Sequence, residues 1–235
     1  MMTTSGAPLG ILTLDTAFPR IPGDVGCPAT FAFPVRIRTV AGATVDDVVH
    51  RPREALLPAF MAAGRQLAND GCIGIATTCG FLARWQAELT AALPIPVLTS
   101  ALLQLPLVAR TLPRTRRAGI VTYSTADLAP DVLAAAGVDP ATPVAGVAPD
   151  GYFARAIRFG AATLDPAQMA ADTIAAARSL AARHPGVGAI VLECANMPPY
   201  RRAVAAAVGL PVFDAAQLIE WFHAGLAGYV RADLW

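Results

Sequence analysis

Gly10-Ile11-Leu12-Thr13-Leu14-Asp15-Thr16-Ala17 is a short apolar run with polar residues near its end, and it returns 109 residues later as Gly119-Ile120-Val121-Thr122-Tyr123-Ser124-Thr125-Ala126. Five of the eight positions are identical in the two runs. A short apolar run bounded by turn residues is typical of a buried strand, so each run predicts a strand with polar residues at its carboxyl end. The recurrence indicates an internal duplication.

A second pair of matching stretches places a cysteine at the end of a predicted strand. These stretches are Thr77-Thr78-Cys79-Gly80-Phe81-Leu82 and Leu192-Glu193-Cys194-Ala195-Asn196-Met197. The two cysteines are 115 residues apart, and each stands 17 residues before a Pro-Val pair that starts another predicted strand. Because several elements recur in the same order, coincidence is a poor explanation for any one of them.

Helices are predicted between these strands from the spacing of apolar residues. The clearest predictions are 53–69, 82–92 and 166–183, with Asp165 as the N-cap of the last. Alternating strands and helices favour an α/β fold with parallel sheets, and such sheets bind ligands beyond the carboxyl ends of their strands. We therefore expect two pseudo-symmetric halves, 1–115 and 116–235, with the active site in the cleft between them and a C-terminal helix that can pack back on the first half.

Composition excludes several classes of chemistry. The chain has 235 residues and a formal net charge of +1, so it lacks the basic surface that nucleic-acid binding requires. All 18 basic residues are arginine, which rules out a lysine Schiff base with pyridoxal phosphate and a P-loop lysine. The three histidines are isolated and no cysteine has metal-ligand spacing, so we expect neither a metal nor a cofactor.

Two stretches bear on the cellular compartment. Met1 to Pro8 has no basic flank before an apolar core, which does not fit a secretory signal. The run from Leu89 to Ala109 carries no charge and is about as long as a membrane span, but its three prolines favour a strand followed by a buried helix. With only four cysteines in no disulfide pattern, we expect a cytoplasmic protein without membrane contact.

The paired cysteines predict acid and base catalysis at a carbon atom. Inverting a stereocentre next to a carboxylate needs a base on one face and an acid on the other, and a pseudo-twofold pair supplies this. Gly80 and Ala195 place each cysteine at a strand-to-helix turn, where backbone N–H groups are expected to lower the thiol pKa. Cys27 and Cys72 have no symmetry mates and are predicted to be inert buried thiols.

Polar groups at the strand ends are predicted to bind the substrate. Asp15 would lie near Cys79 and orient it, while threonine hydroxyls would contact a carboxylate. The full set of predicted substrate-binding residues is Asp15, Thr16, Thr78, Gly80, Thr122, Thr125, Glu193 and Asn196.

These residues resemble the aspartate/glutamate/hydantoin racemase superfamily over nearly the whole chain. The resemblance rests on Thr78-Cys79-Gly80, Glu193-Cys194-Ala195-Asn196-Met197, Thr122-x-x-Thr125 and Asp15. It implies two flavodoxin-like halves, cofactor-independent catalysis by two opposed cysteines, and a homodimer. The sequence departs from the pattern of glutamate and aspartate racemases at Gly80-Phe81, where Asn-Thr is common, and at Asn196, where many glutamate racemases have histidine.

Three functional hypotheses follow. The first is a racemase or epimerase of a small carboxylate, amino acid or hydantoin-like compound, placed in amino-acid metabolism. The second is a lyase, isomerase or ring-directed hydrolase of the same superfamily, in which one cysteine carries the reaction. The third is a non-catalytic small-molecule binding protein, since two-lobed α/β units also serve as sensors.

Overall fold

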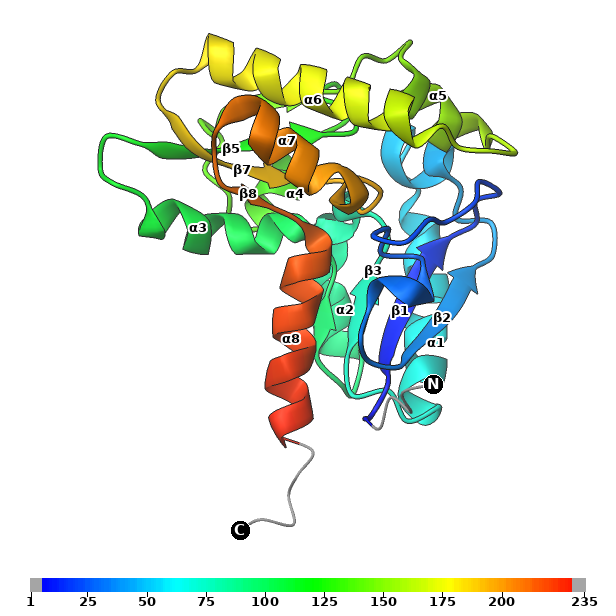
Figure 1. The fold of residues 1–235 in the computed structure, drawn as a ribbon. Coiled ribbons are helices and arrows are strands. Elements are labelled where there is room, and N and C mark those ends of the chain that lie inside the picture. Colours follow the sequence, from blue (N-terminus) through cyan, green and yellow to red (C-terminus); the bar gives the residue numbers. More distant parts are fainter. Residues whose placement is uncertain (1–5, 230–235) are drawn as a thin grey trace.

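The computed structural model describes residues 6–229, in two halves that each contain a four-stranded parallel sheet (Figure 1). Met1 to Ser5, which hold most of the stretch considered for a leader, lie outside that range. The strand order is β2-β1-β3-β4 in the first sheet and β6-β5-β7-β8 in the second. The predicted α/β fold of two equivalent halves is confirmed. The strands are β1 (Leu9–Leu14), β2 (Val35–Val40), β3 (Ile75–Thr77), β4 (Val97–Leu98), β5 (Arg117–Thr122), β6 (Val144–Gly146), β7 (Val187–Leu192) and β8 (Val212–Phe213).

Eight α-helices are described, and the alanine-rich one agrees with its prediction at both ends. Asp165 caps it by accepting hydrogen bonds from the N–H groups of Ala167 and Gln168. The helix predicted over 82–92 instead begins as a 3₁₀ turn at Gly80–Trp85, and only its second part is α-helical. The helices are α1 (Leu57–Asn69), α2 (Gln86–Ala92), α3 (Leu105–Thr111), α4 (Pro130–Ala135), α5 (Tyr152–Phe159), α6 (Pro166–Arg183), α7 (Arg201–Val208) and α8 (Ala215–Tyr229).

The repeated glycines mark the same packing contact in both halves. A Cβ atom at Gly10 would lie 2.9 Å from Cδ1 of Leu67 on α1, and one at Gly119 would lie 2.9 Å from Cδ2 of Leu180 on α6. Each central strand therefore lets one helix approach closely only because it carries glycine there. The identity of these positions in the two runs thus has a structural cause.

The last helix of each half packs on the sheet of the other half. α3 follows the first sheet in sequence, yet it contacts β5 and β7 of the second. α8 follows the second sheet, and its Phe222 and Leu226 approach Gly74 beside Leu9 of the first. Figure 1 shows both helices lying along the neighbouring half. This exchange buries apolar surface across the seam between the halves.

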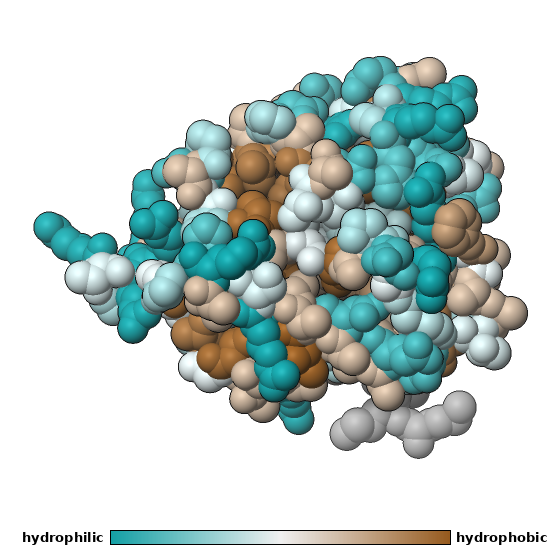
Figure 2. Space-filling model, turned by 90° about the horizontal axis from the view of Figure 1, so that it is seen from above, coloured by the Kyte–Doolittle hydropathy of each residue, from teal (hydrophilic) through white to brown (hydrophobic). Residues whose placement is uncertain are grey.

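The uncharged run from Leu89 to Ala109 is divided among several short elements. It contains the end of α2, strand β4, a 3₁₀ turn at Ala101–Gln104 and the first part of α3. Within residues 6–229, no helix is both long enough and apolar enough to cross a membrane. On the face seen from above, hydrophobic patches are separated by hydrophilic surface (Figure 2).

Candidate active site

Cys79 and Cys194 line one small cavity at the seam between the two halves. The cavity has about 370 Å³ of space not filled by atoms, part of it open solvent. Each cysteine lies just past the carboxyl end of a central strand, β3 or β7, where parallel sheets bind ligands. Five of the predicted substrate-binding residues also line it: Thr16, Thr78, Gly80, Glu193 and Asn196.

The other three predicted residues lie elsewhere. Asp15 is exposed, accepts a hydrogen bond of 2.9 Å from the N–H of Gly42, and lines a neighbouring groove instead. Thr125 is exposed in a separate pocket. Thr122 is fully buried and donates a hydrogen bond of 2.8 Å to Oε2 of Glu193. The prediction that Asp15 orients Cys79 is therefore wrong, because β1 ends at Leu14 and the exposed Asp15 carboxylate bonds to Gly42 instead.

Glu193 is the charged group at the centre of the site. Its side chain is only 1% exposed, and burial raises its pKa to about 7 although the Thr122 hydroxyl and the Tyr123 N–H both favour the carboxylate. Its second oxygen, Oε1, is buried and has no hydrogen-bond partner among the described residues. An unpaired buried carboxylate oxygen is costly, so the site favours a ligand that carries a positive charge or a donor.

Glu193 occupies the space that a side chain at position 80 would need. A Cβ atom at position 80 would lie 2.6 Å from the carbonyl oxygen of Glu193 and would collide with Oε1 of the same residue. This contact brings the strand end of the second half against the loop that follows Cys79 in the first. The departure from the family pattern at Gly80 thus allows a close approach of the two halves.

Both cysteine thiols have a pKa well above neutral pH. Burial raises the pKa of Cys79 to about 12, and the nearby Glu193 adds to the rise. The backbone N–H groups of Phe81 and Leu82 act in the opposite direction but are outweighed. Burial, and then Glu193, also raise the pKa of Cys194 far above its ordinary value. The expected lowering of the thiol pKa is therefore wrong, because desolvation outweighs the N–H groups of the turn.

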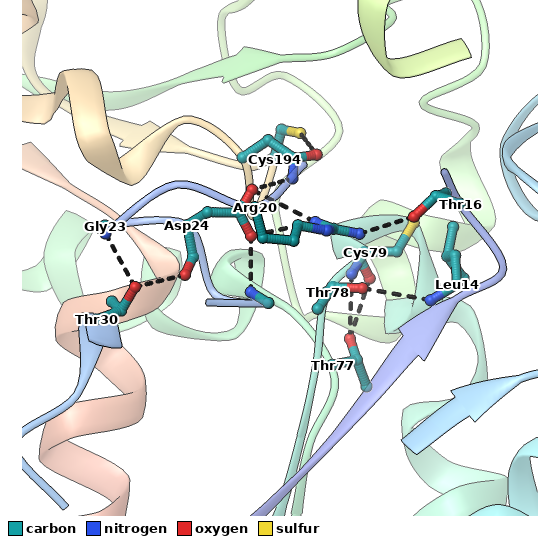
Figure 3. A network of polar contacts seen from close by, with 12 residues as sticks. Leu14, Thr16, Arg20, Gly23, Asp24, Thr30, Thr77, Thr78, Cys79 and Cys194 are labelled. Carbon is teal, nitrogen blue, oxygen red and sulfur yellow. Dashed lines mark hydrogen bonds and ion pairs between the residues drawn. The ribbon is translucent and has the colours of Figure 1, made fainter. Parts of the chain in front are cut away.

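A polar chain leads from Cys194 to the loop that follows β1 (Figure 3). The Cys194 thiol lies 3.5 Å from Oδ1 of Asn196, whose amide donates a hydrogen bond of 2.6 Å to Asp24. Asp24 also holds Arg20 at 3.1 Å, and the guanidinium of Arg20 donates in turn to the Thr16 hydroxyl at 3.0 Å. The first half thus fixes the side chain beside the cysteine of the second.

Several residues of the site are not among the predicted ones. Arg20 is the only basic residue among those that line the cavity, and its guanidinium stacks 4.3 Å from the ring centre of Phe18. Asp24 and Tyr123 were not recognised either. The Pro/Gly-rich composition of 18–30 marks an ordered loop but not which side chain turns inward. The remaining wall is apolar and comes from Leu14, Phe18, Val45, Val49, Phe81 and Ile157.

The other two cysteines take no part in the cavity. Cys27 and Cys72 are buried and free, and burial raises the pKa of Cys72. Neither belongs to the residues that line the cavity. In the part of the chain that the structure describes, no group of three or more His, Cys, Asp or Glu side chains has an arrangement suited to a metal ion.

Comparison with known proteins gives one family. The sequence model described as "Asp/Glu/Hydantoin racemase" matches residues 33–221. "Dimethylsulfoniopropionate lyase" of Durusdinium sp. clade D is 30% identical over 235 residues, covering 97% of this chain and 78% of that protein. "Dimethylsulfoniopropionate lyase 5" of Emiliania huxleyi (strain CCMP1516) is 31% identical over 230 residues, covering 92% of this chain but only 44% of that protein. The chain thus spans less than half of this second relative.

Solved structures with similar folds carry several activities. Arylmalonate decarboxylase has a TM-score of 0.63 at 17% identity, with 94% of this chain and 92% of that chain covered. Allantoin racemase from Pseudomonas fluorescens has a TM-score of 0.64 at 16% identity, with 97% and 92% covered. Aspartate racemase of Picrophilus torridus has a TM-score of 0.59 at 15% identity, with 95% of each chain covered. At these identities the likeness concerns the fold alone.

Proposed function

The chain belongs to the Asp/Glu/hydantoin racemase family, and within this family we propose that it is a lyase that cleaves a small carboxylate by β-elimination. The enzyme would remove a proton from the carbon next to the carboxylate and expel a leaving group from the following carbon. The observation that carries this proposal is the cavity lined by Cys79, Cys194 and Glu193, a carboxyl that has one buried oxygen without a partner among the described residues. A thiolate there is within reach of a carbon acid held in the cavity.

A substrate with a positive charge fits this site. Burial and the nearby Glu193 raise the pKa of both thiols, so a cation bound in the cavity would favour the thiolate. A bound sulfonium or ammonium group would offset the charge of Glu193 and lower the pKa of the nearby thiol. The rings of Phe18, Phe81 and Tyr123 also line the cavity and can face such a cation. Deprotonation of the cysteine would then depend on the substrate.

Among cationic carboxylates, dimethylsulfoniopropionate is the first candidate, because the relatives described above are named lyases of that compound. In the proposed step the Cα–H bond breaks and its proton moves to the thiolate sulfur of Cys194. The released electron pair forms the C=C bond, and the Cβ–S bond breaks with its electrons on sulfur. The products are acrylate, dimethyl sulfide and the neutral thiol. Arg20, held beside Thr16, would bind the carboxylate.

The test is incubation of the purified protein with dimethylsulfoniopropionate in D2O, followed by proton NMR. We expect vinyl signals of acrylate and the methyl signal of dimethyl sulfide from the wild type, and neither from Cys194→Ser. Cys72→Ser is a matched control, because Cys72 is buried away from the cavity, and it should retain the activity. Absence of acrylate from the wild type across a range of substrate concentrations would refute the proposal.

Racemisation is the second candidate, and the placement of one cysteine in each half favours it. A racemase takes a proton from one face of a carbon and returns one to the other, so it consumes and releases no net proton. In the same D2O experiment with chiral amino acids and hydantoins, loss of the α-proton signal without a new product would favour this candidate. Both cysteines would then be needed equally.

A further inference from the structure

Tyr123 separates the reaction cavity from a second, wider pocket. Among residues 6–229, it is the one residue that lines both spaces. The wider pocket lies beyond the carboxyl ends of β5 and β6 and encloses about 1440 Å³ of space not filled by atoms, part of it open solvent. A group on the hydroxyl side of Tyr123 therefore has access to water that the buried cysteines lack.

Two polar side chains stand behind the Tyr123 hydroxyl. The hydroxyl lies 3.4 Å from Nε2 of His50, and Nδ1 of His50 lies 2.8 Å from Oδ2 of Asp127. A carboxylate at Nδ1 holds the proton on that nitrogen, which leaves Nε2 free to accept one from the tyrosine. The hydroxyl is equally far, 3.4 Å, from the carbonyl oxygen of Ala154, so it is not committed to one acceptor.

This chain of groups crosses the seam between the halves and ends at solvent. His50 is the last residue of a π-helical turn at Asp46–His50 in the first half, and such turns are often found at functional sites. Asp127 belongs to the second half and also accepts a hydrogen bond of 2.6 Å from the Ser124 hydroxyl. The side chains of His50 and Asp127 are 19% and 20% exposed, enough to exchange protons with water.

We propose that Tyr123, His50 and Asp127 form a proton relay that carries the thiol proton of Cys194 out of the reaction cavity. This inference rests on the proposed β-elimination, which releases one net proton in each turnover. Substrate binding would drive the proton from Cys194 through the Tyr123 hydroxyl to Nε2 of His50 and then to water. The resulting thiolate takes the α-proton and is again a thiol when acrylate leaves. Tyr123 and Cys194 line the same cavity, and the raised pKa of Tyr123, due to burial first and Cys194 next, keeps its hydroxyl protonated and able to donate.

His50→Ala tests the relay, because it opens a space that faces the wide pocket and is accessible to added imidazole. We expect kcat for acrylate formation from dimethylsulfoniopropionate to fall about a hundredfold, with KM little changed. Proton export should then limit turnover, so the isotope effect of α,α-dideuterated substrate should shrink and the solvent isotope effect should grow. Imidazole should restore both kcat and the wild-type isotope effects.

Three further variants sharpen the test. The kcat of Tyr123→Phe should be as low as that of His50→Ala but should not respond to imidazole. The kcat of Asp127→Asn should lie between that of His50→Ala and that of the wild type. His184→Ala is the matched control, since His184 directly follows α6 and lines neither space, and it should keep the wild-type kcat. The relay would be overturned if His50→Ala kept the wild-type kcat. It would also be overturned if His50→Ala were slower but showed unchanged isotope effects and no rescue by imidazole. In both cases, acrylate formation would still support the lyase. A wild type that forms no acrylate would refute the lyase and the relay together.

Discussion

The two strand ends that carry the cysteines have the same backbone and different chemistry. The N–H of Thr78 bonds to the carbonyl of Leu12 at 3.0 Å, and the N–H of Glu193 bonds to that of Val121 at 2.8 Å. The side chains repeat the match, since the N–H of Leu14 donates to Thr78 at 3.4 Å as the N–H of Tyr123 donates to Glu193 at 3.3 Å. Duplication therefore produced two equivalent frames around one cavity.

The difference lies in the side chains placed on these frames. Where the first half has Thr78 and Leu14, the second has a carboxyl and a phenol, at Glu193 and Tyr123. Of the two cysteines, only Cys194 thus follows a titratable residue directly and has a phenol that connects it to solvent. A symmetric pair of backbones can hold an asymmetric pair of cysteines, and this is why we assign the base to Cys194.

The largest expected effect is the loss of kcat in Cys194→Ser, which tests the assignment of Cys194 as the base. Cys194→Ser replaces the proposed base by a hydroxyl that does not ionise near neutral pH, so kcat for acrylate formation should fall about a thousandfold or more. Quantifying acrylate by NMR at saturating substrate measures this. Circular dichroism and the melting temperature should stay near the wild-type values, because serine is close in size to cysteine. If Cys194→Ser kept substantial activity, the base would have to be assigned to Cys79 instead.

The next prediction concerns Glu193 and the dependence of the protein's stability on pH. A pKa raised from 4.5 to about 7 means that Glu193 is ionised at lower pH in the unfolded chain than in the fold. Stability from this group is complete below pH 4.5 and is lost as the pH rises through about 7. The loss is about 3 kcal/mol in the free energy of unfolding. Glu193→Gln stays neutral and can still accept the bonds from Thr122 and Tyr123.

Urea unfolding at several pH values from 5 to 8 measures this difference. The free energy of unfolding of the wild type, minus that of Glu193→Gln, should decrease toward pH 8. A constant difference across the series would mean that Glu193 keeps its ordinary pKa in the fold. The variant also tests whether the carboxylate recognises the cationic part of the substrate, in which case its KM for dimethylsulfoniopropionate should rise.

A third prediction concerns the residues that follow the cysteines, Gly80 and Ala195. Gly80→Ala places a methyl group against Glu193 and should lower the free energy of unfolding by about 1–3 kcal/mol. Thermal or urea unfolding measures it. Gly225→Ala is the control, because a Cβ there meets no atom within 4 Å inside helix α8, and it should be neutral or slightly stabilising. Equal effects at the two positions would show that Glu193 moves aside at no cost.

The smallest expected effect is at the other cysteine. Under the lyase proposal Cys79 borders the cavity without being the base, so Cys79→Ser should reduce kcat by only about tenfold, through altered packing of the cavity wall. The ratio of the kcat loss in Cys194→Ser to that in Cys79→Ser measures how differently the two cysteines contribute to catalysis. If both variants lose activity equally, the two cysteines act as a racemase pair and the comparison of the two strand ends must be revised.

The sequence predicted those parts of the molecule that depend on local pattern. The repeated runs predicted the central strands and the cleft, and the position of each cysteine at a strand end predicted their meeting. Asp15 was misplaced because the pattern locates the end of a strand only approximately, and one residue decides whether a side chain points inward. Arg20, Asp24 and Tyr123 were missed because loop conformation and contacts between halves decide their roles, and neither leaves a periodic signal.

The exchange of α3 and α8 between the halves bears on the history of the protein. Two identical chains that traded their last helices would form a closed dimer, and joining them end to end would leave the arrangement found here. The linker would need to be only as long as the path from one helix to the next strand. A gene fusion of that kind also frees each copy to mutate by itself, which a symmetric dimer of identical subunits cannot do.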